Sequence, residues 1–239
     1  MKPIRIEQNR PIGEIVADFP TAALIFKKHR IDFCCGGDRP LSVAAGAKQV
    51  DVQTVIEELH AAYQAEANRK DRGTDWQSAD YTALVDHVLD THHAYLKREL
   101  SGIGEFTNRI RNVHGYHHPE LLRLDELFRQ VKAELEEHMQ KEEAQIFPLV
   151  KQYAAAGDRE LLAEAVKTID ELEAEHSAVG ELLEEMREIT ADYTLPPEAC
   201  RSYTVTFEKL EELEDDMFQH IHLENNIMFP RLEKELSAL

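Results

Sequence analysis

The amino-acid sequence predicts an all-α protein, in which a small helical N-terminal domain over residues 1–70 precedes an antiparallel four-helix bundle over residues 76–239. Strand signals are nearly absent from the 239 residues, whereas long segments are rich in Ala, Leu, Glu and Lys, the residues that favour helices. The 10 glycines and 9 prolines fall mostly between these segments. Four of the segments are long and closely spaced, as in bundles whose neighbouring helices run in opposite directions.

Three short helices are expected in the N-terminal domain. Pro11 opens the first, Pro20 precedes the second, and Asp51 is placed to cap the third. A tight loop is expected over Asp32–Gly37, where the sequence reads DFCCGG and ends in two glycines. The polar stretch over residues 68–74 is predicted to be the linker to the bundle.

The four bundle helices each have a recognisable start. The first begins near Asp80, and Pro119 starts the second, because proline suits the first helical position. Asp158 caps the third helix, and Pro196–Pro197 starts the fourth. The expected helices end near Val113, beyond Glu142, near Thr190 and beyond Glu224.

The charge of the chain excludes several classes of partner. Lys and Arg number 27 against 46 Asp and Glu, which gives a formal net charge of −19. Nucleic acids and anionic membrane surfaces attract basic proteins, so neither is expected as a partner. No apolar run approaches the roughly 20 residues that span a bilayer, and the first residues lack the apolar core of a signal peptide. Because 3 cysteines, two of them adjacent, make no disulfide framework, we expect a cytoplasmic protein.

A repeated motif predicts where the chemistry of the bundle takes place. The pattern H-x3-E-x4-F-P occurs twice, over His138–Pro148 and over His220–Pro230. Each copy follows a segment with another histidine at nearly the same distance upstream, His93 for the first copy and His176 for the second. The second half of the bundle therefore looks like a copy of the first.

Helix geometry places the polar residues of the motifs on the apolar faces of their helices. Residues four apart lie on the same face, so His138 and Glu142 point the same way, as do His220 and Glu224. Ionised carboxylates buried there are costly unless they are paired or bound to a metal. Four imidazoles that converge on two carboxylates are natural ligands for two metal ions, and carboxylate bridges between paired metals favour iron or manganese. The motifs therefore predict a dinuclear metal site.

The first bundle helix leaves its ligand open. His87, His92 and His93 compete there, and both His92 and His93 lie on acceptable apolar faces. The spacing of the repeat favours His93 by a single residue. The E-x-x-H pairs of ferritin-like bundles are not at the right places, so a histidine-rich, hemerythrin-like di-iron centre fits better.

On these residues the chain resembles the iron-sulfur cluster repair di-iron proteins, the RIC family of the YtfE and ScdA type. The resemblance is carried by the DFCCGG motif, both H-x3-E motifs with their Phe-Pro, Glu175–His176, and the LENN sequence that ends at Asn226. It covers almost the whole chain and implies a small ScdA-type domain followed by a hemerythrin-like bundle. Members of this family restore iron-sulfur clusters damaged by nitric oxide or oxidants, and are thought to supply iron.

The resemblance also implies a ligand set and a cofactor. The cofactor is a pair of non-haem irons bridged by an oxo group and by two carboxylates. The residues that match the family's ligands are four histidines and two bridging glutamates: His93, His138, His176, His220, Glu142 and Glu224. In the first helix the resemblance assigns His93. The implied partners are damaged iron-sulfur cluster proteins, with NO or O2 as small ligands.

Further residues are candidates for supporting roles. Glu134 and Asp216 recur one turn before the two motif histidines, and Glu175 precedes His176. All three are expected either to accept hydrogen bonds from ligand imidazoles or to form a polar path for iron, unless they are merely solvated. Cys34 and Cys35 are candidates for a redox or docking role, the alternative being inert thiols in a buried turn.

The sequence leaves the use of the metal centre open. Iron donation for cluster repair under nitrosative or oxidative stress is the first hypothesis. A hemerythrin-like carrier or sensor of O2 or NO is one alternative, and a di-iron NO reductase is another, so the sequence does not decide whether the protein is an enzyme. The N-terminal cysteines argue against a simple carrier. Whether the chain forms a homodimer, which cluster proteins it serves, and what the histidine-rich loop with His114, His117 and His118 does also stay open.

Overall fold

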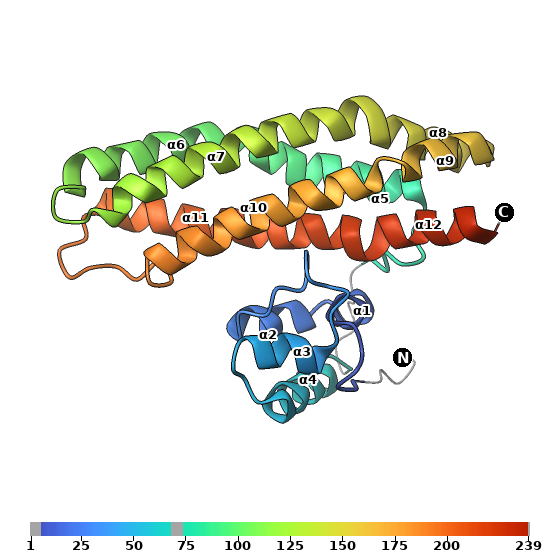
Figure 1. Cartoon of the computed structure of the whole chain (residues 1–239), viewed down its shortest axis with the longest axis horizontal. Coiled ribbons are helices and arrows are strands. Elements are labelled where there is room, and N and C mark those ends of the chain that lie inside the picture. Colours follow the sequence, from blue (N-terminus) through green and yellow to red (C-terminus); the bar gives the residue numbers. More distant parts are fainter. Residues whose placement is uncertain (1–5, 68–73, 239) are drawn as a thin grey trace. The chain divides into compact units, whose positions relative to one another are not determined.

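The computed structural model describes residues 6–67 and 74–238, and Figure 1 shows that these parts are built from helices. Within the described ranges no residue lies in a β-strand, and strand-like pairing is limited to an isolated bridge between Pro11 and Pro40. The predicted all-α class with its helical bundle is thereby confirmed. No helix in the described part of the chain is long and apolar enough to cross a membrane. Apart from Thr74, the predicted linker over 68–74 lies outside the described residues.

The chain divides into two compact units. One unit comprises residues 1–80 together with residues 221–239, and the other comprises residues 81–220. This division groups the C-terminal residues with the N-terminal helices, whereas the sequence-based expectation assigns them to the bundle. The fourth bundle helix therefore belongs to one unit over most of its length and to the other beyond His220.

Short helices in the first unit surround a core that includes the fully buried Ile15, Phe26 and Leu59. They are α1 (Ile12–Asp18), α2 (Ala22–Lys28), α3 (Leu41–Ala47), α4 (Val52–Ala67), the π-helical segment η3 (Glu224–Met228) and α12 (Phe229–Ala238). Asp51 caps α4 by accepting a hydrogen bond from the backbone N–H of Gln53 at 3.3 Å. Helix α3 is not predicted from the sequence.

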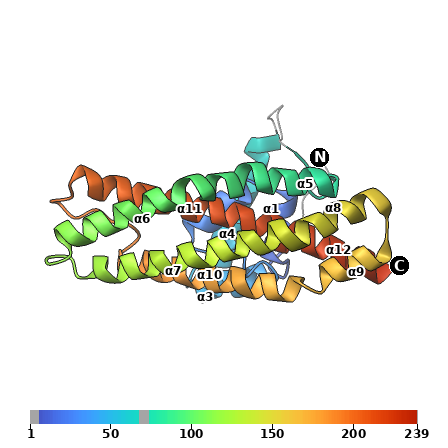
Figure 2. The same cartoon turned by 90° about the horizontal axis from the view of Figure 1, so that it is seen from above.

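The second unit contains four helical arms. The first arm is α5 (Tyr81–His87), the π-helical segment η1 (Val88–His93) and α6 (Ala94–His114), and the second is α7 (Glu120–Lys141), the π-helical segment η2 (Glu142–Ile146) and α8 (Phe147–Ala156). The third is α9 (Arg159–Val166) with α10 (Ile169–Ile189), and the fourth is α11 (Arg201–Leu223). Figures 1 and 2 show α6, α7, α10 and α11 lying lengthwise beside one another, and α7 packs against both α6 and α10.

Two expected helix boundaries in the bundle are wrong. The third arm is two helices, and at the break between them the hydroxyl of Thr168 donates to the carbonyl of Ala165 at 2.8 Å. The fourth arm begins at Arg201 instead of Pro196–Pro197. Each proline disfavours helical geometry in the residue before it, so the two prolines form a turn closed by the Ala199 N–H and the Pro196 carbonyl at 3.0 Å.

The start of α9 gives a test of the local structure. The Asp158 carboxylate accepts the backbone N–H of Glu160 at 2.8 Å, as an N-cap does. We expect Asp158→Ala to lower the free energy of unfolding by about 1 kcal/mol in urea denaturation, because it leaves a helix-end N–H without its acceptor. Asp158→Asn keeps an acceptor and should stay close to the wild type, and equal losses in both variants would show that the cap is not the cause.

Candidate metal centre

Three π-helical segments carry candidate ligands of the predicted metal site. His93 is the last residue of η1, Glu142 is the first residue of η2, and Glu224 is the first residue of η3. A π-helical turn contains an extra residue, which changes the face on which the following side chains lie, and such turns are frequent at functional sites. His138 and His220 lie one turn before Glu142 and Glu224, on the regular helices α7 and α11.

The Phe-Pro pairs account for the two π-helical segments in the repeat. In a regular α-helix, the rings of Pro148 and Pro230 would clash with the carbonyls of Ala144 and Asn226, four residues earlier. Proline also lacks the N–H that would bond those carbonyls. Widening the preceding turn by one residue relieves both problems, and the widened turn begins at the motif glutamate in each copy. The Phe-Pro of the motif therefore shapes the backbone beside each glutamate.

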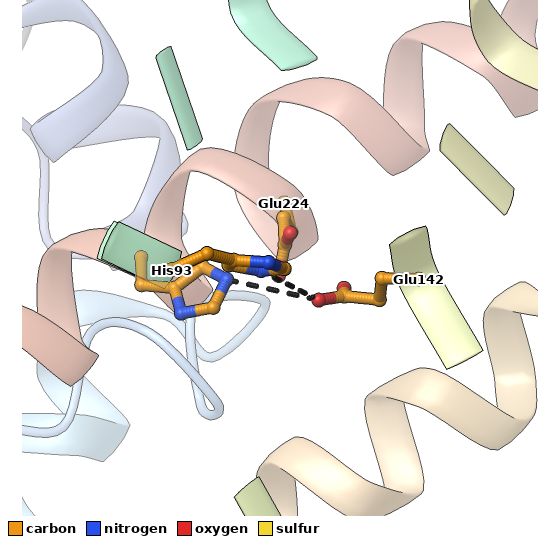
Figure 3. Close-up of side chains that lie close together, drawn as sticks. His93, Glu142 and Glu224 are labelled. Atoms are coloured by element: carbon orange, nitrogen blue, oxygen red, sulfur yellow. Dashed lines mark hydrogen bonds and ion pairs between the residues drawn. The ribbon is translucent and has the colours of Figure 1, made fainter. Parts of the chain in front are cut away.

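The six candidate ligands of the bundle come together and are buried. Each of these side chains is at most 2% exposed. Their ligand atoms form two groups, each with all members within 4.8 Å of one another: His93, Glu142, His220 and Glu224 in one, and His138, Glu142, His176 and Glu224 in the other. Glu142 and Glu224 belong to both groups, and Figure 3 shows them with His93, whose ring faces the Glu142 carboxylate.

The two oxygens of Glu142 face different histidines. Oε2 lies 3.0 Å from His93 Nε2 and 3.9 Å from His220 Nε2, whereas Oε1 lies 3.2 Å from His138 Nε2. His138 Nε2 in turn lies 2.9 Å from His176 Nε2. The two oxygens of this carboxylate thus face different ligand groups: Oε2 faces His93 and His220, and Oε1 faces His138.

This donor set fits a pair of metal ions. Two carboxylates with fully buried side chains are strongly disfavoured without positive charge close by. Four imidazole nitrogens that face them are neutral donors suited to transition metals, and the two shared carboxylates supply negative charge to both positions. The residues present therefore match a site for two cations.

Two further glutamates hold the imidazoles of two candidate ligands in place. His93 Nδ1 donates to Glu143 Oε1 at 2.7 Å, and His138 Nδ1 donates to Glu175 Oε2 at 2.8 Å. With Nδ1 bonded to an outer carboxylate, Nε2 is the nitrogen of each ring that faces the centre. A lysine bonds each of these glutamates on its outer side: Lys97 bonds Glu143, and Lys141 bonds Glu175.

Both outer carboxylates are ionised. Burial alone raises the pKa of Glu143, but the hydrogen bonds from Lys97 and His93 outweigh it and lower the pKa below its ordinary value. The pKa of Glu175 is lowered in the same way, since the hydrogen bonds from Lys141 and His138 outweigh burial. Negative charge at both positions strengthens the hold on the imidazole N–H groups.

The remaining candidates for supporting roles lie elsewhere. Asp216 accepts a hydrogen bond from His92 Nδ1 at 2.9 Å, and the His92 ring is parallel to that of His220, with ring centres 5.4 Å apart. His92 is buried but is in neither ligand group. Glu134 is exposed on α7, and among the described residues no hydrogen bond joins it to a candidate ligand imidazole.

Glu143, which bonds His93, is a supporting residue that the sequence does not predict. Next to Glu142, it falls outside the four-residue spacing from which the ligands were identified. Nothing in the local sequence singles it out, because its partner His93 lies on a different arm of the bundle.

The two adjacent cysteines lie in the first unit, in the loop between α2 and α3. Cys34 is buried and Cys35 is half-buried, and both are thiols whose Sγ atoms lie 3.7 Å apart. Asp32 Oδ1 accepts the backbone N–H of Cys34 at 3.1 Å and that of Cys35 at 3.0 Å, so its side chain folds the loop. Burial, with smaller effects of Cys35 and Asp32, raises the pKa of Cys34 well above its ordinary value.

The histidine-rich loop lies at one end of the bundle arms. His114 Nε2 lies 3.2 Å from the thiol of Cys200. His118 bonds Glu120 at 3.0 Å and Glu198 at 3.1 Å, and these hydrogen bonds raise the pKa of His118. These contacts tie the turn after α6 to the segment before α11.

Helical arms that bring histidines and glutamates together in their core define a hemerythrin-like metal-binding protein. The family model described as the hemerythrin HHE cation binding domain matches residues 84–232. A second model, ScdA_N, described as a domain of unknown function, matches residues 8–63.

Similar proteins place the whole chain in one family. The iron-sulfur cluster repair protein ScdA of Staphylococcus haemolyticus is 33% identical over 219 residues, which are 91% of this chain and 95% of the relative. The iron-sulfur cluster repair protein YtfE of Escherichia coli O157:H7 is 33% identical over 224 residues, which are 94% of this chain and 96% of the relative. The YtfE protein of Shigella boydii serotype 4 matches to the same extent. The chain belongs to the family of iron-sulfur cluster repair proteins of the ScdA and YtfE type.

The hydrogen bond between Glu143 and His93 can be tested by its effect on metal affinity. Residues that orient a metal-bound histidine typically contribute about 10- to 100-fold to metal affinity, so we expect Glu143→Ala to weaken metal binding by about that factor. The measurement is competition with a chelator on the full chain. Glu134→Ala removes the same charge from an exposed position of the same arm and should bind metal like the wild type. Equal affinity of the two variants would contradict the role given to Glu143.

Proposed function

We propose that this protein repairs iron-sulfur clusters damaged by nitric oxide or oxidants, and that it does so by supplying iron held in its bundle. Membership of a family whose relatives are named for cluster repair supports the reaction class. The observation that carries the iron hypothesis is the pair of ligand groups that share Glu142 and Glu224. A site for two adjacent cations suits the storage of iron, because an iron-sulfur cluster contains more than one iron atom.

We assign one iron to each histidine pair. His93 and His220 would hold one ion and His138 and His176 the other, and Glu142 and Glu224, which belong to both ligand groups, would serve both ions. The bound irons supply redox chemistry, because mixed histidine and carboxylate ligation suits both ferrous and ferric ions. The chain's own contribution is to exclude water from the ligands and to hold their imidazole rings in place through Glu143 and Glu175.

A groove beside Glu143 offers a route between the buried ligands and solvent. This groove has a volume of about 380 Å³ and is lined by Lys97, Glu136, Met139, Gln140, Glu143 and Ala144. Glu143 bonds His93 on its inner side and Lys97 on its outer side, so its carboxylate connects a ligand with the groove. We propose that iron leaves past this carboxylate, which offers an oxygen ligand on the way out.

The N-terminal residues provide the second part of the proposed function. We assign the docking of the damaged recipient protein to the ScdA-type domain over residues 1–70, and the iron centre to residues 76–239. The half-buried Cys35 is the accessible thiol of the DFCCGG loop and is the first candidate for contact with a recipient.

Removal of a bridging glutamate tests the centre. We expect Glu142→Ala and Glu224→Ala each to reduce the two irons per chain to one or none, because each glutamate serves both histidine pairs. Iron is counted after anaerobic loading, together with the near-ultraviolet charge-transfer spectrum. Glu134→Ala is the matched control and should keep both irons. Two irons per chain in both bridging variants would refute the bridging roles.

The repair function is tested with iron transfer. The iron-loaded protein is mixed with an apo iron-sulfur protein, sulfide and a reductant, and the cluster spectrum of the recipient is followed. We expect clusters to form with the wild type and not with the Glu142→Ala variant at equal protein concentration. Tight reversible O2 binding without transfer would indicate a carrier instead, and steady turnover of NO with an electron donor would indicate a reductase.

A further inference from the structure

The DFCCGG loop of the first unit gathers metal-ligating atoms outside the bundle centre. Asp32, Cys34 and Cys35 each offer one ligand atom, and the three atoms lie within 4.8 Å of one another. Cys34 Sγ is 3.2 Å from Asp32 Oδ1 and 3.7 Å from Cys35 Sγ. Two sulfur donors beside a carboxylate are a ligand set that favours thiophilic cations.

Hydrogen bonds hold these atoms in place. Asp32 Oδ1 accepts the N–H groups of both cysteines, and Arg39 donates to the carbonyls of Asp32 at 3.1 Å and Gly36 at 3.2 Å. Because the loop is closed by these bonds, the two thiols stay side by side without a disulfide between them. A preorganised ligand set loses little conformational entropy when a cation binds.

The second glycine of the motif lets the loop approach a helix. A Cβ atom on Gly37 would lie 1.9 Å from Asn226 Oδ1 and 2.8 Å from the Phe33 carbonyl oxygen, so no larger residue fits. Asn226 donates to the carbonyls of Phe33 at 3.1 Å and Cys34 at 3.2 Å. The cysteine loop is thereby fastened to η3, the helical turn that begins with Glu224.

The loop is also open to solvent on one side. Asp32 and Cys35 are half-buried, whereas Cys34 is 1% exposed. Asp32 and Cys35 therefore form the solvent-facing side of the loop, with the sulfur of Cys34 behind them. In the absence of a cation, burial keeps the Cys34 thiol protonated. Binding of a divalent cation by both sulfurs releases two protons and leaves two metal–thiolate bonds, with no change of oxidation state.

We propose that Asp32, Cys34 and Cys35 form a second metal site that binds one thiophilic divalent cation, separate from the two cations of the bundle. Three protein ligands leave a coordination position open, as in sites that exchange or transfer what they bind. If the proposed function holds, the cation bound here in the cell is ferrous iron in transit to a recipient. The site itself does not depend on that function.

Cadmium tests the site in the reduced full chain under anaerobic conditions. Thiolate ligation of Cd2+ gives an ultraviolet charge-transfer band that histidine and glutamate ligands do not give, so the bundle centre contributes nothing to this readout. We expect one thiolate-bound Cd2+ per chain in the wild type. The Cys200→Ser variant, in which only the two loop cysteines remain, should give the same stoichiometry and the same band.

Variants of the loop complete the test. Cys34→Ser combined with Cys35→Ser should abolish the band. Asp32→Asn keeps the oxygen that folds the loop but removes its charge, and we expect it to weaken Cd2+ binding about 10-fold while the band remains. Far-ultraviolet circular dichroism and iron binding by the bundle show that each variant is folded. A band that disappears in Cys200→Ser, a band that survives in the double variant, or one Cd2+ shared between two chains would overturn the proposal.

Discussion

The burial of two carboxylates among four imidazoles is the constraint on which the rest of the molecule depends. The Glu142 and Glu224 side chains are fully buried, and ionised groups in that position need a compensating charge. A bound cation provides such a charge, so metal binding would add directly to the free energy of folding of the bundle interior. Two ion pairs nearer the surface support this arrangement, Glu143 with Lys97 and Glu175 with Lys141. Their glutamates bond the imidazole rings that face the buried carboxylates and hold those rings in place.

The repeated motif acts on the backbone as well as on the ligands. Its histidine and glutamate supply donor atoms, whereas its Phe-Pro opens a π-helical turn directly after each histidine-containing helix. One short sequence pattern therefore sets both the identity of the ligands and the local geometry that presents them. The first arm contains a π-helical segment without proline, and there the candidate ligand His93 is the last residue of the segment instead of preceding it. This difference explains why the spacing of the repeat left His92 and His93 so close as candidates.

Much of the fold and of the ligand set follows from the sequence, because helix periodicity and four-residue spacing are local properties. The all-α class, the caps at Asp51 and Asp158 and the convergence of the motif residues follow from such signals. Contacts between residues far apart in the chain do not follow from local sequence signals. The bond between Glu143 and His93 depends on how two arms meet, and the exposed position of Glu134 depends on which face of α7 its neighbours cover. The break between α9 and α10 is not predicted because no proline or glycine marks it in the sequence.

The two ion pairs that orient candidate ligand imidazoles differ in their access to water, and this difference makes the support of the two rings unequal. The Lys97 side chain is 55% exposed, whereas that of Lys141 is 30% exposed. Dissolved salt screens an exposed pair more than a sheltered one, over a Debye length of about 8 Å at physiological ionic strength. Rising ionic strength therefore loosens the ring of His93 before that of His138. The support behind the His93 ring is therefore the more sensitive of the two to salt, and the hold on the His138 ring is the more durable.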